Sequence, residues 1–220
     1  MSRALHCRNL ILAFLFAFTF IGCGGDANRN PPPAPNTTDE SAQNSSPAAP
    51  ELTADGKQRV AVVFSGGHET NPIDHGRPVA LIGPALGVTP ETFREAFSDV
   101  RPSPGGAPPS RERAMSNKET LMKVLAPHGI TNEQLDTVSN YYRYNPSRGE
   151  MWPTRPAKAV AIVENGVVTS FEITDGGAGY SSPPSVTVPG VANAALEVQL
   201  SFGKQLDQNG SVTAINVENR

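Results

Sequence analysis

The apolar residues of this chain follow three patterns, and each pattern predicts a different kind of structure. Residues 10–21 form a nearly continuous apolar run, residues 24–58 hold almost no large apolar side chains, and the rest alternates between helical and strand spacing. The first run is shorter than the ~20 apolar residues that span a bilayer. The second stretch cannot offset its ordering entropy by burial, so we expect residues 23–58 to form a disordered stalk.

Residues 59–156 are expected to form a mainly helical region after one opening strand. That strand is predicted at 59–64, where β-branched and apolar residues follow one another. An apolar segment at 78–86 predicts a short helix or turn. Three further helices are signalled by a hydroxyl residue at the N-cap: Thr89 before Pro90, Ser116 three residues before Glu119, and Thr131 three residues before Gln134. We expect these helices at about 90–99, within 111–126 with a firm part at 117–126, and at about 132–142.

Residues 157–220 change to a period of two and predict an antiparallel β unit. Asn165-Gly166 lies between two apolar segments and predicts a hairpin with a type I′ turn. Asn209-Gly210 predicts another tight turn, and further strands are expected at 185–188, 195–202 and 211–217. The expected fold class is therefore α+β: a small helical region with one N-terminal strand, packed against a C-terminal antiparallel β unit.

The first 26 residues resemble the export signal of bacterial lipoproteins. Arg3 and Arg8 precede the apolar run, and the run ends in Phe20-Ile21-Gly22-Cys23, which resembles a lipobox with Phe20 in place of the usual leucine. We expect residues 1–22 to be a signal peptide and Cys23 to be the lipid attachment site. A plain signal peptide cut at another position is the alternative. The lipid would anchor the protein to a membrane of the bacterial cell envelope, outside the cytoplasm.

The charge limits which partners the exported domain can bind, and the cysteine content limits how it can be stabilised. Of the 18 basic residues, Arg3 and Arg8 precede Cys23, so 16 remain against 21 acidic residues, a formal charge of −5. This balance argues against nucleic-acid binding, which needs a basic footprint. The only cysteines are Cys7 and Cys23, so we expect no disulfide in the exported domain.

Two groups of sequence phrases resemble known proteins. The segment GVVTSFEITDGGAGYSSPPSVTV at 166–188 resembles the GGxGYxxxP β repeat of phage tail-fibre and bacterial surface proteins, in one copy. The phrases SGGHET, DHGRPV, LGVTPETFREAF, ITNEQLDTVSNYYRY and RGEMWPT resemble an uncharacterised family of secreted proteins from planctomycete-type bacteria. This resemblance covers most of residues 60–217. It implies an exported location and a surface-protein-like β unit, and it assigns no catalytic residue.

Two clusters are candidate sites. Imidazole and carboxylate ligands for zinc or another divalent cation are grouped on one loop: His68, Glu69, Asp74 and His75. The spacing is not HExxH, because Pro72 stands where the second histidine would be. A polar loop whose side chains bond nearby backbone is the favoured alternative.

The second cluster is aromatic and basic: Tyr141, Tyr142, Tyr144 and Trp152 lie among Arg143 and Arg148. Exposed, these rings would form a surface for sugars or a protein partner. Buried, they would join the helical and β parts, which is the favoured interpretation.

The sequence therefore predicts a lipid-anchored extracytoplasmic interaction or structural protein of the cell envelope. Its partners would be the membrane, through the lipid, and an envelope protein or polysaccharide. The alternative is a metal-dependent hydrolase that uses the loop from His68 to His75, with that metal as its one implied cofactor. No catalytic residue is assigned, and the absence of a catalytic motif favours the non-enzymatic hypothesis.

Overall fold

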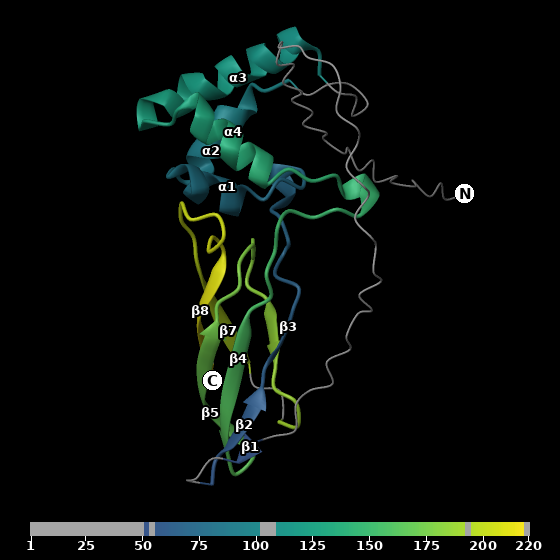
Figure 1. The fold of residues 1–220 in the computed structure, drawn as a ribbon, viewed down its shortest axis with the longest axis vertical. Helices are drawn as coiled ribbons and strands as arrows, with labels where there is room; N and C mark the ends of the chain where they lie inside the picture. The colour runs from purple at the N-terminus through teal and green to yellow at the C-terminus, as the bar shows by residue number, and fades with distance from the viewer. Residues whose placement is uncertain (1–50, 53–55, 102–108, 192–194, 218–220) are drawn as a thin grey trace, which may run out of the picture.

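A helical layer lies at one end of the molecule and an elongated β layer at the other (Figure 1). The computed structural model describes residues 51–52, 56–101, 109–191 and 195–217. The predicted signal peptide, the predicted lipid attachment site at Cys23 and most of the predicted stalk lie outside the described residues. The α+β fold class is confirmed, with helices beside antiparallel sheets.

The helical layer contains four α-helices and short 3-10 turns among the described residues. The helices are α1 (Val79–Leu86), α2 (Pro90–Ser98), α3 (Arg111–Leu125) and α4 (Asn132–Tyr141), and the turns include η1 (Pro72–Asp74), η3 (Ala126–His128) and η4 (Pro146–Arg148). Their apolar faces share one core, in which Leu81 and Leu125 are fully buried. In this layer α2 packs against α1 and α3, and α4 packs against α1.

Two of the three predicted helix starts are confirmed. Thr89 accepts a hydrogen bond from the Thr92 amide, and Thr131 forms a complete capping box with Gln134. The helix expected within 111–126 is confirmed as α3, but the predicted cap at Ser116 is wrong, because α3 already begins after Ser110, whose hydroxyl accepts from an amide in the first turn. The five residues before Ser116 are mostly good helix formers, so they extend the helix once Ser110 satisfies its free amides.

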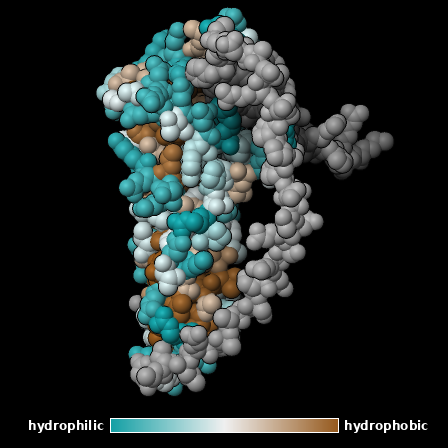
Figure 2. Space-filling model, viewed as in Figure 1, coloured by the Kyte–Doolittle hydropathy of each residue, from teal (hydrophilic) through white to brown (hydrophobic). Residues whose placement is uncertain are grey.

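The β layer consists of one four-stranded sheet and two strand pairs, all antiparallel. The large sheet has the order β1-β2-β4-β5, formed by β1 (Glu51–Leu52), β2 (Gln58–Ala61), β4 (Lys158–Glu164) and β5 (Val167–Asp175). The pairs are β3 (Val63–Ser65) with β6 (Ser185–Thr187), and β7 (Leu196–Ser201) with β8 (Ser211–Val217). Figure 2 shows apolar side chains reaching the surface over this layer.

The predicted hairpin is confirmed, whereas the strand predicted at 59–64 is divided into two strands. Asn165 and Gly166 have φ angles of 51° and 79°, as a type I′ turn requires. The segment predicted as one strand changes sheets at Val62: β2 pairs with β4, and β3 pairs with β6. The apolar pattern continues through this break because both halves pack on the β layer. Residues 56–65 therefore belong to the β layer and not to the helical region.

The layers are joined at the glycine-rich segment that follows β5, Gly176–Tyr180. Trp152 Nε1 donates to the Gly179 carbonyl at 2.8 Å, and the Gly179 amide donates to the Asn209 carbonyl at 2.8 Å. A Cβ on Gly179 would lie 2.6 Å from the Pro153 carbonyl oxygen, so only glycine allows this approach. The loop between β7 and β8 reaches the helical layer here (Figure 1). The GGAGY motif thus has a structural role in holding the two layers together.

Candidate binding pocket

The four residues of the predicted metal site do not form a ligand set. No group of three or more His, Cys, Asp and Glu side chains that could hold a metal ion occurs in the part of the chain that the structure describes. His68 turns toward the joint, where its ring stacks on Tyr180 with centroids 5.1 Å apart. The Glu69 carboxylate accepts a hydrogen bond from the Ser182 hydroxyl. Both side chains are thereby held against the β layer.

Asp74 and His75 belong to the helical layer instead. Asp74 is 2% exposed, and its two carboxylate oxygens accept hydrogen bonds from Arg94 at 2.8 and 2.9 Å. His75 is exposed and adopts a left-handed backbone conformation that ends η1. The turn η1 therefore separates the two pairs of ligands, and the metal-dependent hydrolase loses the ligand set on which it depended.

The aromatic cluster is packed into the joint, and two of its members, Tyr142 and Tyr144, also line the pocket described below. Tyr142 and Trp152 are each 3% exposed. The Tyr144 hydroxyl donates to the Gly76 carbonyl, and its ring packs edge-on against Trp152 with centroids 5.2 Å apart. Tyr141 packs edge-on against Tyr142 at 5.0 Å. Of the two alternatives that the sequence left open, the structure shows the buried one.

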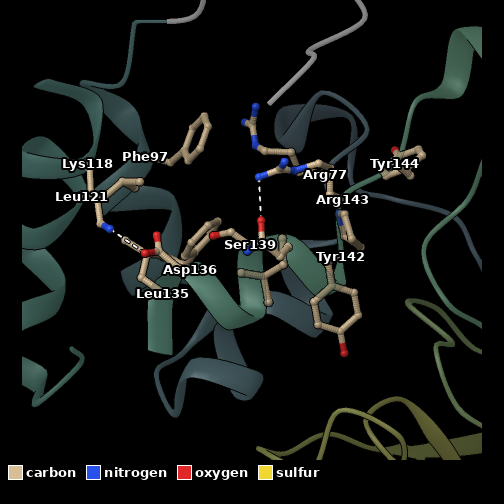
Figure 3. Close-up of a pocket in the computed structure, with 14 residues that line it drawn as sticks. Arg77, Phe97, Lys118, Leu121, Leu135, Asp136, Ser139, Tyr142, Arg143 and Tyr144 are labelled. Carbon is tan, nitrogen blue, oxygen red and sulfur yellow. Dashed lines mark hydrogen bonds and ion pairs between the residues drawn. The ribbon is translucent and has the colours of Figure 1, made fainter. Parts of the chain in front are cut away.

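A pocket that the sequence did not signal lies in the helical layer, among α2, α3 and α4 (Figure 3). It encloses about 100 Å³. Its floor is apolar and includes Phe93, Leu121 and Leu135, which are buried in the core that the helices share. These side chains line the pocket because α2, α3 and α4 each bury one apolar face against the others. The floor is therefore held by the same packing that stabilises the layer.

One side of the pocket is cationic. Figure 3 shows Arg77 and Arg143 on that side and the ion pair of Lys118 with Asp136 on the opposite side. The Arg77 guanidinium carbon lies 4.0 Å from the centroid of the Phe97 ring. The lining residues carry three cationic groups and one carboxylate, a formal excess of two positive charges. That carboxylate, Asp136, accepts a hydrogen bond from Lys118 at 2.7 Å.

Arg143 is held by a neighbouring side chain at the end of α4. Its Nη2 donates to the side-chain oxygen of Asn140 at 2.7 Å, whereas its Nε is buried and has no hydrogen-bond partner among the described residues. Burial lowers the pKa of both Arg77 and Arg143, and the charges of Asp74 and Asp136 offset this only in part. Both guanidinium groups remain charged at neutral pH, because arginine titrates far above it. The pocket thus holds cations that are partly desolvated.

The sequence does not show that the residues of this pocket lie close together in space. Arg77 lies just before α1, in the DHGRPV phrase, and Arg143 lies just after α4, in the YYRY phrase. Arg143 belongs to the aromatic and basic cluster that the sequence signals, whereas Arg77 has only its place before the apolar helix α1 as a signal. Their shared position depends on how α1 and α4 pack, and this packing is not encoded by local spacing.

Three comparisons with known proteins give no match: no family model, no curated protein and no solved structure is similar to this chain. In the described part of the chain, every helix is too short or too polar to cross a membrane.

Proposed function

We propose that this protein is a lipid-anchored interaction protein of the bacterial cell envelope, and that the pocket in its helical layer is a ligand-binding site. The observation that carries the binding role is the pairing of a buried apolar floor with partly desolvated arginines. Ligand sites in proteins characteristically combine a mainly apolar lining with a few fixed polar groups. The proposed partners are envelope components, either proteins or polysaccharides, that carry a group small enough for this pocket.

The groups that line the pocket favour binding over catalysis. Its one carboxylate, Asp136, is held by Lys118 and is poorly placed to act as a general base. Ser139 has no histidine among the lining residues, so the base that a serine nucleophile needs is missing there. Burial raises the pKa of Tyr142 to about 12, so its phenol stays protonated at neutral pH. Cations around an apolar floor recognise and hold a ligand without reacting with it.

The proposed location follows from the sequence. An apolar run that ends in Gly22-Cys23, followed by a stretch poor in large apolar residues, is the expected layout of a lipoprotein. A flexible chain of the length of residues 24–58 has an r.m.s. end-to-end distance of about 30–35 Å. That distance would hold the folded domain clear of the lipid headgroups, with its pocket accessible to other envelope components.

The location is tested by expressing the full chain in bacteria, labelling with a fatty acid and separating membranes from soluble fractions. We expect label and protein to stay with the membrane, and Cys23→Ser to abolish the label. Cys7→Ser, the other cysteine, is the matched control and should leave labelling unchanged. Membrane retention and normal processing of Cys23→Ser would contradict the anchor.

The binding role is tested by measuring thermal stability of the purified full chain with an envelope extract of the producing bacterium. Ser139→Trp places a large ring on the half-buried pocket wall, whereas Thr137→Trp adds the same ring on an exposed position of α4 outside the pocket. We expect the extract to raise the melting temperature of the wild type and of Thr137→Trp, and not that of Ser139→Trp. An equal response of all three proteins would refute binding at the pocket.

A further inference from the structure

We propose that the pocket binds a small organic acid, with one carboxylate attached to an apolar group about the size of a phenyl ring. This inference rests on the proposed binding function, and it names the chemical class of the ligand. It follows from three features of the pocket: its volume, its apolar floor and its cationic side.

Volume sets the size of the apolar group. The pocket encloses about 100 Å³, whereas a water molecule occupies about 30 Å³ of the liquid, and a cavity of ~150 Å³ with apolar walls holds benzene. The pocket is smaller than that cavity but is open to solvent on one side, so a ring or a branched chain of about four to six carbons rests on the floor of Phe93, Leu121 and Leu135 with one edge at the mouth. A long acyl chain or a nucleobase with its sugar would not fit inside.

Charge sets the polar end of the ligand. Arg77 and Arg143 both line the pocket, and burial lowers the pKa of each, so their charges are only partly solvated. The nearest carboxylates are engaged elsewhere, since Asp136 binds Lys118 and Asp74 binds Arg94. A guanidinium group matches the two oxygens of a carboxylate in geometry and in charge. A ligand carboxylate on this side of the pocket would be attracted by Arg77 and Arg143 while its apolar group rests on the floor.

The same features exclude the neighbouring classes of ligand. A cation would be repelled by the excess positive charge of the lining. A neutral alcohol fits the floor but offers no charge to the arginines. Inorganic phosphate and acetate offer charge but leave the apolar floor unfilled. Affinity should therefore require the carboxylate and the apolar group together.

A matched set of water-soluble probes tests this requirement. Phenylacetate, 2-phenylethanol and 2-phenylethylamine share a ring and differ in charge, and acetate carries the charge without the ring. Each is titrated calorimetrically into the full chain in lipid nanodiscs, with empty nanodiscs subtracted. We expect phenylacetate to bind about 10-fold or more tightly than 2-phenylethanol, as a charged hydrogen bond implies. The amine and acetate should show no measurable binding.

Variants assign the binding to this pocket. Arg143→Gln should reduce phenylacetate affinity about 10-fold and leave 2-phenylethanol unchanged. Arg148→Gln is the matched control, because Arg148 is exposed and lies outside the pocket. Ser139→Trp should abolish binding of both probes, and Thr137→Trp should affect neither.

The carboxylate could come from a free acid or from the C-terminus of a peptide. A short peptide ending in phenylalanine, compared with its C-terminal amide, separates these sources: tighter binding of the free-acid peptide than of phenylacetate identifies a peptide terminus.

Equal affinity for phenylacetate and 2-phenylethanol, or phenylacetate binding that survives Ser139→Trp, would overturn the inference. If envelope extract still stabilises the wild type through the pocket while phenylacetate does not bind, the inference fails and the proposed function stands. If the extract does not stabilise the protein and phenylacetate does not bind, the inference and the proposed function both fail.

Discussion

Replacing Asn209 by alanine should weaken the joint between the two layers more than any surface change. Asn209 is 1% exposed. Its Nδ2 donates to the Leu81 carbonyl at 2.8 Å and to the Tyr142 hydroxyl at 2.7 Å, and its Oδ1 accepts from the Gly203 amide at 3.0 Å. Alanine removes all of these bonds and leaves their partners buried without them.

The expected loss of stability follows from these bonds. A net contribution of ~0.5–1.5 kcal/mol for each hydrogen bond, with a further penalty for the stranded partners, gives a loss of about 3–4 kcal/mol. In a domain of this size, such a loss lowers the melting temperature by about 10 °C. Asn216→Ala, on the exposed face of β8, is the matched control and should change stability by less than ~0.5 kcal/mol.

Equilibrium unfolding in urea, followed by two probes, measures this effect. Trp152 is the only tryptophan and lies at the joint, so its fluorescence reports on the contact between the layers, while far-UV circular dichroism reports on secondary structure. We expect the two transitions to coincide in the wild type and to shift to lower urea in Asn209→Ala. If Asn209→Ala lost no more stability than Asn216→Ala, Asn209 would not join the layers.

Three further predictions concern other buried groups. Burial raises the folded-state pKa of Tyr142 to about 12, so its contribution to stability is complete below pH ~10 and is lost as the pH rises toward 12. Between these two pH values, unfolding measurements should show a smaller loss of stability for Tyr142→Phe than for the wild type. An equal loss in the two proteins would contradict the raised pKa of Tyr142. Asp74→Asn should cost about 2–3 kcal/mol in urea unfolding because it breaks a buried carboxylate's two hydrogen bonds from Arg94, whereas the exposed Glu91→Gln should cost less than ~1 kcal/mol, and similar values would refute the distinction. Gly179→Ala should lower the melting temperature much more than Gly190→Ala does, since both glycines have positive φ but a Cβ at Gly190 meets nothing within 4 Å. Equal shifts in calorimetry would show that the close approach of Gly179 to the Pro153 carbonyl is not needed.

Features that depend on neighbours along the chain could be predicted from the sequence. The capping box of Thr131 with Gln134 and the turn at Asn165-Gly166 are both confirmed, because each is formed by residues within a few positions of one another. The α+β class follows from the change of hydrophobic period near residue 157. The helix within 111–126 could be predicted as well, but the spacing of Ser116 with Glu119 marked the wrong cap, because Ser110 caps α3.

Features that depend on distant residues were decided by the tertiary structure. Asn209 reads as a turn residue in the sequence, yet its side chain binds Tyr142 and Leu81, which are 67 and 128 positions away. The loop from His68 to His75 looked like a ligand set, but partners in different layers separate its side chains. Arg77 and Arg143 came together in one pocket, which no local signal predicted. The sequence determined the elements and the expected location of this protein, and only the packing of the layers determined which side chains share a site, because convergence in space is set by long-range contacts.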